Sequence, residues 1–135
     1  MPGWLHHKRF YMRFQIFFIL AAATTLAACS ASSTEALPTL TLFEQLGESV
    51  YTVRCAQCHA LIPDTVIIGP SLAGIATRAG SRLEGYDARS YIETSILSPQ
   101  DYLVQGFPDT MPTNFAKELT SEEFEAVVEF LMTLK

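Results

Sequence analysis

The stretch Cys55-Ala56-Gln57-Cys58-His59 places a histidine directly after the second of two closely spaced cysteines. A thiol redox pair with this spacing usually lies in a chain that alternates strands and helices, and the sequence shows no such alternation. A zinc site takes four ligands, whereas Cys55, Cys58 and His59 are the only cysteines and histidines after residue 39. A disulfide closing so small a loop would leave His59 unexplained. These three alternatives are therefore disfavoured.

The remaining chemistry for this stretch is covalent attachment of haem. In Cys-x-x-Cys-His the two thiols can add to the two vinyl groups of one haem, and the histidine comes round beneath the iron. Two thioether bonds and one Fe–N bond then fix the porphyrin to a single helical turn. The sequence predicts one haem c, bound through Cys55 and Cys58, with His59 as an iron ligand.

Helical patterns lie on both sides of this stretch. Apolar residues gather on one face of a helix over about residues 41–55. Near the other end, Thr120-Ser121-Glu122-Glu123 forms a capping box, in which Thr120 is the N-cap and Glu123 reaches back. Apolar residues follow it at spacings of three and four up to Leu134. We expect a helix in each segment.

The middle of the chain carries weaker helical signals. Asp87 can cap a helix that ends at Leu97, before Ser98-Pro99, and short helical turns are expected over residues 72–78 and 101–106. No two alternating runs are joined by a turn, so the predicted fold is all-α. A domain of this size with long irregular stretches has a thin core, which a porphyrin would fill.

Beyond these patterns, residues 42–134 resemble the class I cytochromes c. Gly47-x-x-x-Tyr51-x-x-x-Cys55 is similar to the spacing that this family uses where its first and last helices cross. The resemblance implies a cytochrome c fold, with three to five helices wrapped around one covalent haem c, over residues 40–135. It also implies electron transfer and not an enzymatic activity.

The loop that follows His59 is also similar to that of the family. It contains Gly69-Pro70-Ser71-Leu72, and by resemblance the Pro70 carbonyl accepts a hydrogen bond from the outer nitrogen of His59, which fixes the ring and raises its basicity. The same resemblance implies that Arg78 and Tyr86 lie near the haem propionates. Arg78 is explained equally well as a solvated surface charge.

The segment Gly106-Phe107-Pro108-Asp109-Thr110-Met111-Pro112 resembles the Met-Pro ligand loop of the family, which implies that Met111 is the sixth iron ligand. A lone methionine is more often core filler than a ligand, and Met132 is the other candidate in the domain, on the packing face of the last helix. A thioether ligand favours the ferrous iron and raises the potential. Walls of the haem pocket are expected from aromatic and aliphatic residues, which would equally pack helix on helix: Tyr91, Ile96, Tyr102, Phe107 and Phe115.

The N-terminal segment is interpreted as a targeting signal. A basic start, a short apolar run over residues 16–23 and small residues before Cys29 are typical of an exported protein, and the ending Leu26-Ala27-Ala28-Cys29 resembles a bacterial lipoprotein signal. We predict a signal peptide over residues 1–28 (with Met12 as a candidate start), a lipidated Cys29, and a flexible linker to residue 39. A plain signal peptide or an uncleaved anchor are the alternatives.

The charge distribution bears on partners. After residue 28 the chain has 6 basic and 14 acidic residues, which argues against nucleic-acid binding. The expected location is exported, tethered to a membrane and facing the periplasm or the cell exterior. The expected function is one-electron transfer in a respiratory or photosynthetic chain, with a quinol-oxidising complex, terminal oxidase or reaction centre as partner.

Two other functions stay open. The chain could be a fixed monohaem subunit of a larger quinol-oxidising or oxidase complex, such as alternative complex III. A haem enzyme or gas sensor would need a labile sixth ligand and a distal acid–base group, and no histidine other than His59 is present after residue 39. That second alternative is therefore disfavoured.

Overall fold

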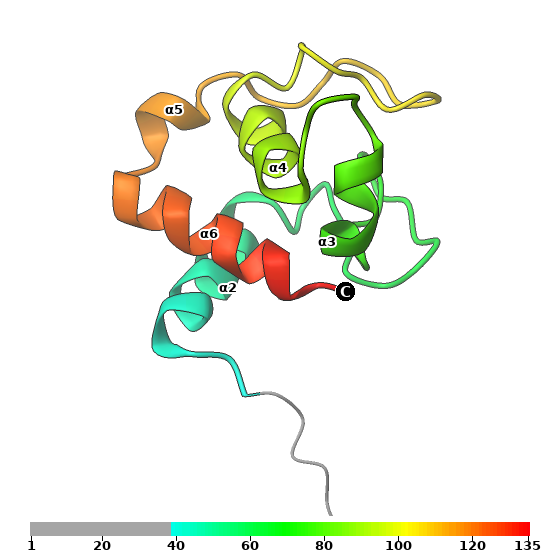
Figure 1. Ribbon diagram of the computed structural model, residues 1–135. Helices are drawn as coiled ribbons and strands as arrows, with labels where there is room; N and C mark the ends of the chain where they lie inside the picture. The colour runs from blue at the N-terminus through cyan, green and yellow to red at the C-terminus, as the bar shows by residue number, and fades with distance from the viewer. Residues whose placement is uncertain (1–38) are drawn as a thin grey trace, which may run out of the picture. The chain divides into compact units, whose positions relative to one another are not determined.

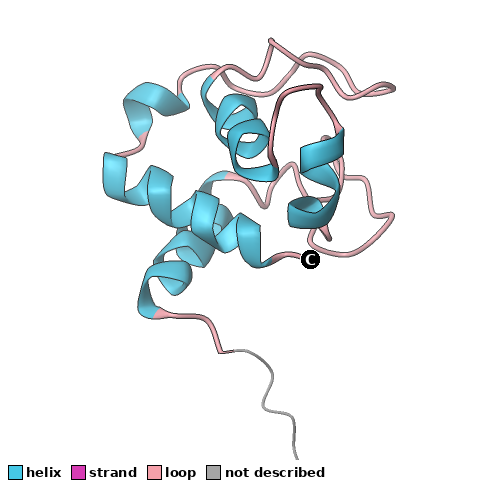
Figure 2. Ribbon diagram, viewed as in Figure 1, coloured by secondary structure: helices cyan, strands magenta, loops and turns pink. Residues whose placement is uncertain are grey.

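The structure is a computed structural model that describes residues 39–135 (Figure 1). The predicted signal peptide, Cys29 and almost the whole linker lie outside this part of the chain. The helices are listed in chain order: α2 (Leu42–Arg54), α3 (Ile75–Arg78), the 3-10 turn η1 (Ala79–Ser81), α4 (Ala88–Leu97), α5 (Phe115–Glu118) and α6 (Ser121–Thr133). Within residues 39–135 there is no strand, only an isolated bridge between His59 and Val66 (Figure 2). The all-α prediction is confirmed.

None of the helices within residues 39–135 has the length and apolar character needed to cross a membrane.

The two longest helices begin with the same capping arrangement. At the start of α6, the Thr120 hydroxyl accepts a hydrogen bond from the Glu123 N–H at 3.2 Å, and the Glu123 carboxylate accepts one from the Thr120 N–H at 2.9 Å. Thr41 and Glu44 form the same pair at the start of α2. Each box satisfies two N–H groups that a helix end leaves without a partner. The predicted capping box at residues 120–123 is confirmed.

α2 and α6 cross at a position that lacks a side chain (Figure 1). A Cβ placed on Gly47 would lie 2.5 Å from the carbonyl carbon of Ala126 and 2.7 Å from Cβ of Phe130, so only glycine permits this approach. One turn further along α2, the Tyr51 ring packs on Phe130 with centroids 5.7 Å apart. The crossing implied by the Gly47–Tyr51 spacing is present in the structure.

The middle of the chain departs from the sequence prediction in one place. Residues 101–106 contain no helix, so that part of the prediction is wrong. Hydrogen bonds here close only isolated turns, for example from the Phe107 N–H to the Val104 carbonyl, and Gly106 has a φ of +89° that a helix cannot accommodate. The predicted α4 is confirmed with Asp87 as its cap, and α3 lies within the predicted 72–78 segment.

Candidate functional site

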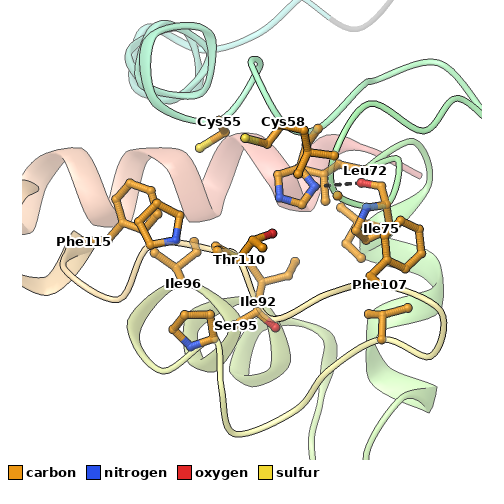
Figure 3. Close-up of a pocket in the computed structure, with 18 of the residues that line it drawn as sticks. Cys55, Cys58, Leu72, Ile75, Ile92, Ser95, Ile96, Phe107, Thr110 and Phe115 are labelled. Atoms are coloured by element: carbon orange, nitrogen blue, oxygen red, sulfur yellow. Dashed lines mark hydrogen bonds between the residues drawn. The ribbon is translucent and has the colours of Figure 1, made fainter.

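The helices and the 98–114 loop enclose a cavity of about 480 Å³. Cys55 and Cys58 lie on one side of it, and Ile92 and Ile96 of α4 lie across from them (Figure 3). Six of the predicted haem-site residues line this cavity: Cys55, Cys58, His59, Pro70, Arg78 and Met111. All five predicted wall residues line it as well: Tyr91, Ile96, Tyr102, Phe107 and Phe115. Segments that are far apart in sequence therefore converge on one space.

The Cys55–His59 stretch forms a single turn at the end of α2. Cys55 is the C-cap of that helix, and its carbonyl accepts a hydrogen bond from the His59 N–H at 2.9 Å. Burial raises the pKa of the Cys55 thiol to about 11, and the nearby Cys58 adds to this rise while Arg54 opposes it. Before attachment, the Cys55 sulfur is therefore a protonated thiol at neutral pH.

The ring of His59 is fixed by the loop that follows it. Its Nδ1 lies 2.7 Å from the Pro70 carbonyl oxygen, drawn as a dashed line in Figure 3. A carbonyl can only accept, so Nδ1 carries the hydrogen and Nε2 of the neutral ring keeps a free lone pair. The imidazole is thus prepared to bind a metal through Nε2, with a backbone carbonyl as its orienting partner.

Two further groups hold His59 in place. A Cβ on Gly69 would lie 2.8 Å from His59 Nδ1 and 3.0 Å from Nε2, so the imidazole occupies the space that a side chain at residue 69 would fill. The Tyr51 hydroxyl donates a hydrogen bond to the His59 carbonyl at 2.5 Å, and burial raises the pKa of Tyr51. Backbone and ring are therefore both restrained.

Arg78 lines the cavity with its guanidinium tied to the backbone. It donates hydrogen bonds to the carbonyl oxygens of Ala73 and Ser71. Burial, and then the positive charge of Arg82, lower the pKa of Arg78. The solvated-surface interpretation of Arg78 is thus not what the structure shows, because this side chain is partly buried.

The structure does not bring Tyr86 to the cavity. Its side chain is 38% exposed and is not among the lining residues. The tyrosine that reaches the cavity from α4 is Tyr91, which is 6% exposed and packs edge-on against Tyr102. Tyr91 was predicted as a wall residue, whereas the family resemblance implied that Tyr86 was the tyrosine near the propionates.

Three charged residues of the cavity were not predicted from the sequence: Arg54, Arg82 and Glu118. Arg54 and Glu118 form an ion pair of 3.3 Å between α2 and α5. For Arg82 a signal was available, since it follows Arg78 by four residues, a spacing that places two side chains on one side of a helical segment.

The family model for cytochrome c matches residues 44–135. The chain belongs to the cytochrome c family. Members of this family are haem-based electron carriers, and so is this protein. The family's cofactor is a covalent haem c, and the two cysteines needed to attach it, Cys55 and Cys58, are present. The curated proteins include no significant match to the chain.

The residues present fit this cofactor. Two thiols and an imidazole lie on one turn, and the loop after them leaves the space next to the ring free of a side chain at Gly69. The cavity walls are largely aliphatic and aromatic, as a porphyrin face requires. This cytochrome c can hold haem c through Cys55 and Cys58, and His59 Nε2 would be free to bind its iron.

Proposed function

We propose that this cytochrome c carries one electron at a time, with His59 and Met111 as the two axial ligands of its haem. The observation that carries the proposal is that Met111 lines the same cavity as His59. Met132, the other methionine of the described chain, packs at the core and does not line it. Met111 also lies next to Pro112 in a segment without helix, so its backbone has the freedom to cross a haem face.

The chain's own groups set the properties of such a carrier. When bound, haem c supplies an iron that alternates between the ferric and ferrous states. The Pro70 carbonyl holds the Nδ1 proton of His59 and so fixes the ring and raises its basicity. A Met111 thioether favours the ferrous state and raises the potential. With both axial positions filled, no position is left for a substrate, which favours electron transfer over catalysis.

Absorption spectroscopy of the Met111→Ala variant tests this ligation. The wild-type protein should be low-spin in both oxidation states and take up no CO. Removal of the thioether should give a high-spin ferric spectrum, immediate CO uptake by the ferrous protein and a lower midpoint potential. Met132→Ala is the matched control, because it also removes one methionine side chain but leaves the cavity lining intact, and its spectrum should match the wild type. A wild-type spectrum in Met111→Ala would exclude Met111 as a ligand.

We further propose that the protein is exported and lipid-anchored through Cys29, and that it works in a membrane-bound respiratory or photosynthetic chain. The support is the Leu26-Ala27-Ala28-Cys29 ending and the short linker after it, which would average roughly 17 Å. Cys29→Ser should move the haem-stained protein from the membrane fraction to the soluble fraction. Retention in the membrane fraction would contradict lipid attachment at this residue.

The short linker favours a partner in the same membrane. A diffusing carrier and a fixed subunit of a larger complex differ in one measurement, native electrophoresis with haem staining after gentle detergent extraction. Migration alone supports a carrier. Migration with a multi-haem assembly supports a subunit of a quinol-oxidising or oxidase complex, such as alternative complex III.

A further inference from the structure

The charges that line the cavity do not balance. The charged residues that line it are Arg54, Glu118, Arg78 and Arg82. Arg54 and Glu118 neutralise each other in an ion pair of 3.3 Å. Arg78 and Arg82 remain, so the cavity carries two uncompensated positive charges.

No carboxylate of residues 39–135 pairs with these two arginines. The ion pairs of this part of the chain join Arg54 to Glu118 and Arg89 to both Glu93 and Glu129. The chain has an excess of acidic residues, so carboxylates are abundant but none is placed here. Two neighbouring cations partly withdrawn from water are unfavourable, and the lowered pKa of Arg78 reflects this. A ligand with two negative charges would remove the imbalance.

The two arginines differ in how many donors they have left. Arg78 already donates to the carbonyl oxygens of Ala73 and Ser71. The Arg82 guanidinium forms no hydrogen bond within the described residues, although it is partly buried at the cavity. Since a guanidinium has five N–H donors in a planar fork that matches a carboxylate, Arg82 is the better placed of the two to bind one directly.

We propose that Arg82 donates hydrogen bonds to a propionate of haem c and that, with Arg78, it fixes the side of the cavity on which both propionates lie. Haem c carries two carboxylates, which matches the two uncompensated charges. This inference rests on the proposed function and deepens it. It adds Arg82 to Arg78 near the propionates, where the sequence resemblance had placed Arg78 and Tyr86.

The propionate protonation state provides a direct readout. A nearby cation favours the ionised carboxylate and lowers its pKa, so loss of Arg82 raises the pKa. The other titratable groups that face this space are Arg78 from α3, Tyr91 from α4, Tyr102 from the 98–114 loop, the Arg54–Glu118 pair, and Cys55, Cys58 and His59 of the haem-attachment turn. In contrast, Glu84 and Asp87, which follow Arg82 in the chain, do not line the cavity.

The experiment is redox titration of the intact haem-loaded protein across a pH series, for the wild type and for Arg82→Gln, Arg82→Lys and Arg89→Gln. In Arg82→Gln, the inflection of potential against pH should move upward by about one pH unit or more, and the potential at neutral pH should fall because one cation fewer favours ferric iron. Arg82→Lys keeps the charge without the planar fork and should give a smaller shift in the same direction. Arg89→Gln removes a charge that is paired outside the cavity and should shift neither quantity.

Curves of Arg82→Gln and Arg89→Gln that superimpose would overturn the proposal. If Arg82→Gln does not retain haem, Arg82→Met decides, because it also removes the charge and the donors, and a curve identical to that of Arg89→Gln would overturn the proposal. The proposed function fails separately. A wild-type spectrum in Met111→Ala would refute the axial ligation, whatever the Arg82 variants show. If Met111→Ala loses its sixth ligand as expected but the Arg82→Gln curve matches that of Arg89→Gln, this inference alone is refuted.

Discussion

The crossing of α2 and α6 makes Gly47→Ala the most informative stability variant of this protein. An added methyl group would lie 2.5 Å from the carbonyl carbon of Ala126 and 2.7 Å from Cβ of Phe130. Non-bonded carbons prefer separations of about 3.5–4.0 Å. The two helices would have to move apart by about 1 Å, and a gap of that size forfeits roughly a quarter to a half of each dispersion contact.

The magnitude follows from two opposing effects. Overpacking of a core costs about 1–3 kcal/mol, and the upper end applies because the methyl meets backbone that cannot rotate away. Alanine regains about 1 kcal/mol of helix propensity over glycine. The net expected loss is about 2 kcal/mol, which for a domain of this size lowers the melting temperature by roughly 8–16 °C.

Thermal unfolding followed by far-UV circular dichroism, at equal haem content, measures this loss. The matched control is the pair Glu48→Ala and Glu48→Gly at the next, exposed residue of α2, where alanine should be the more stable by up to about 1 kcal/mol. The preference should thus reverse between residues 47 and 48. The close-packing explanation is refuted if Gly47→Ala melts at or above the wild-type temperature.

Two further predictions concern the His59 loop and the helix caps. In Gly69→Ala, the new methyl would displace the His59 ring, since it would lie 2.8 Å from Nδ1; we expect a changed ferrous absorption spectrum and a lower melting temperature, and an unchanged spectrum would contradict the role of Gly69. Hydrogen bonds accepted from Ser90 and from Thr120 lower the pKa of Asp87 and Glu123 below their ordinary values of 3.8 and 4.5. A carboxyl group whose pKa is lowered in the folded state stabilises the fold at pH values above its ordinary pKa, and this effect is lost as the pH falls through the pKa of the folded state. The free energy of unfolding, measured by urea titration, should therefore decline below about pH 4.5, and less steeply in Glu123→Gln.

Features with a local cause were predictable from the sequence. The capping box of Thr120 and Glu123 depends on residues three apart, and the turn of Cys55–His59 on residues within one helical turn. Gly47 was placed at the helix crossing through a family resemblance, and the geometry of its contact with Ala126 agrees with it. In each case few competing arrangements exist.

Features that depend on long loops were not predictable in the same way. Whether Tyr86 or Tyr91 reaches the cavity depends on how the chain between η1 and α4 turns, and periodicity carries no information on that. The four residues of α5 are too few for a helical pattern to be recognised. The four-residue spacing of Arg82 from Arg78 places the two on one side of a helical segment, but the charge of Arg82 is seen to be uncompensated only once Arg54 and Glu118 are found to pair with each other in the same cavity.

The two sides of the cavity differ in how firmly the chain supports them. His59 is held through Tyr51, Pro70 and the end of a packed helix, whereas Met111 lies in a loop closed only by isolated turns. Segments with few backbone hydrogen bonds open locally at a lower free energy than the global unfolding. Amide hydrogen exchange should therefore be fast around Met111 and slow around Tyr51, so the loop that carries Met111 can open while the turn of His59 and the helix crossing stay folded.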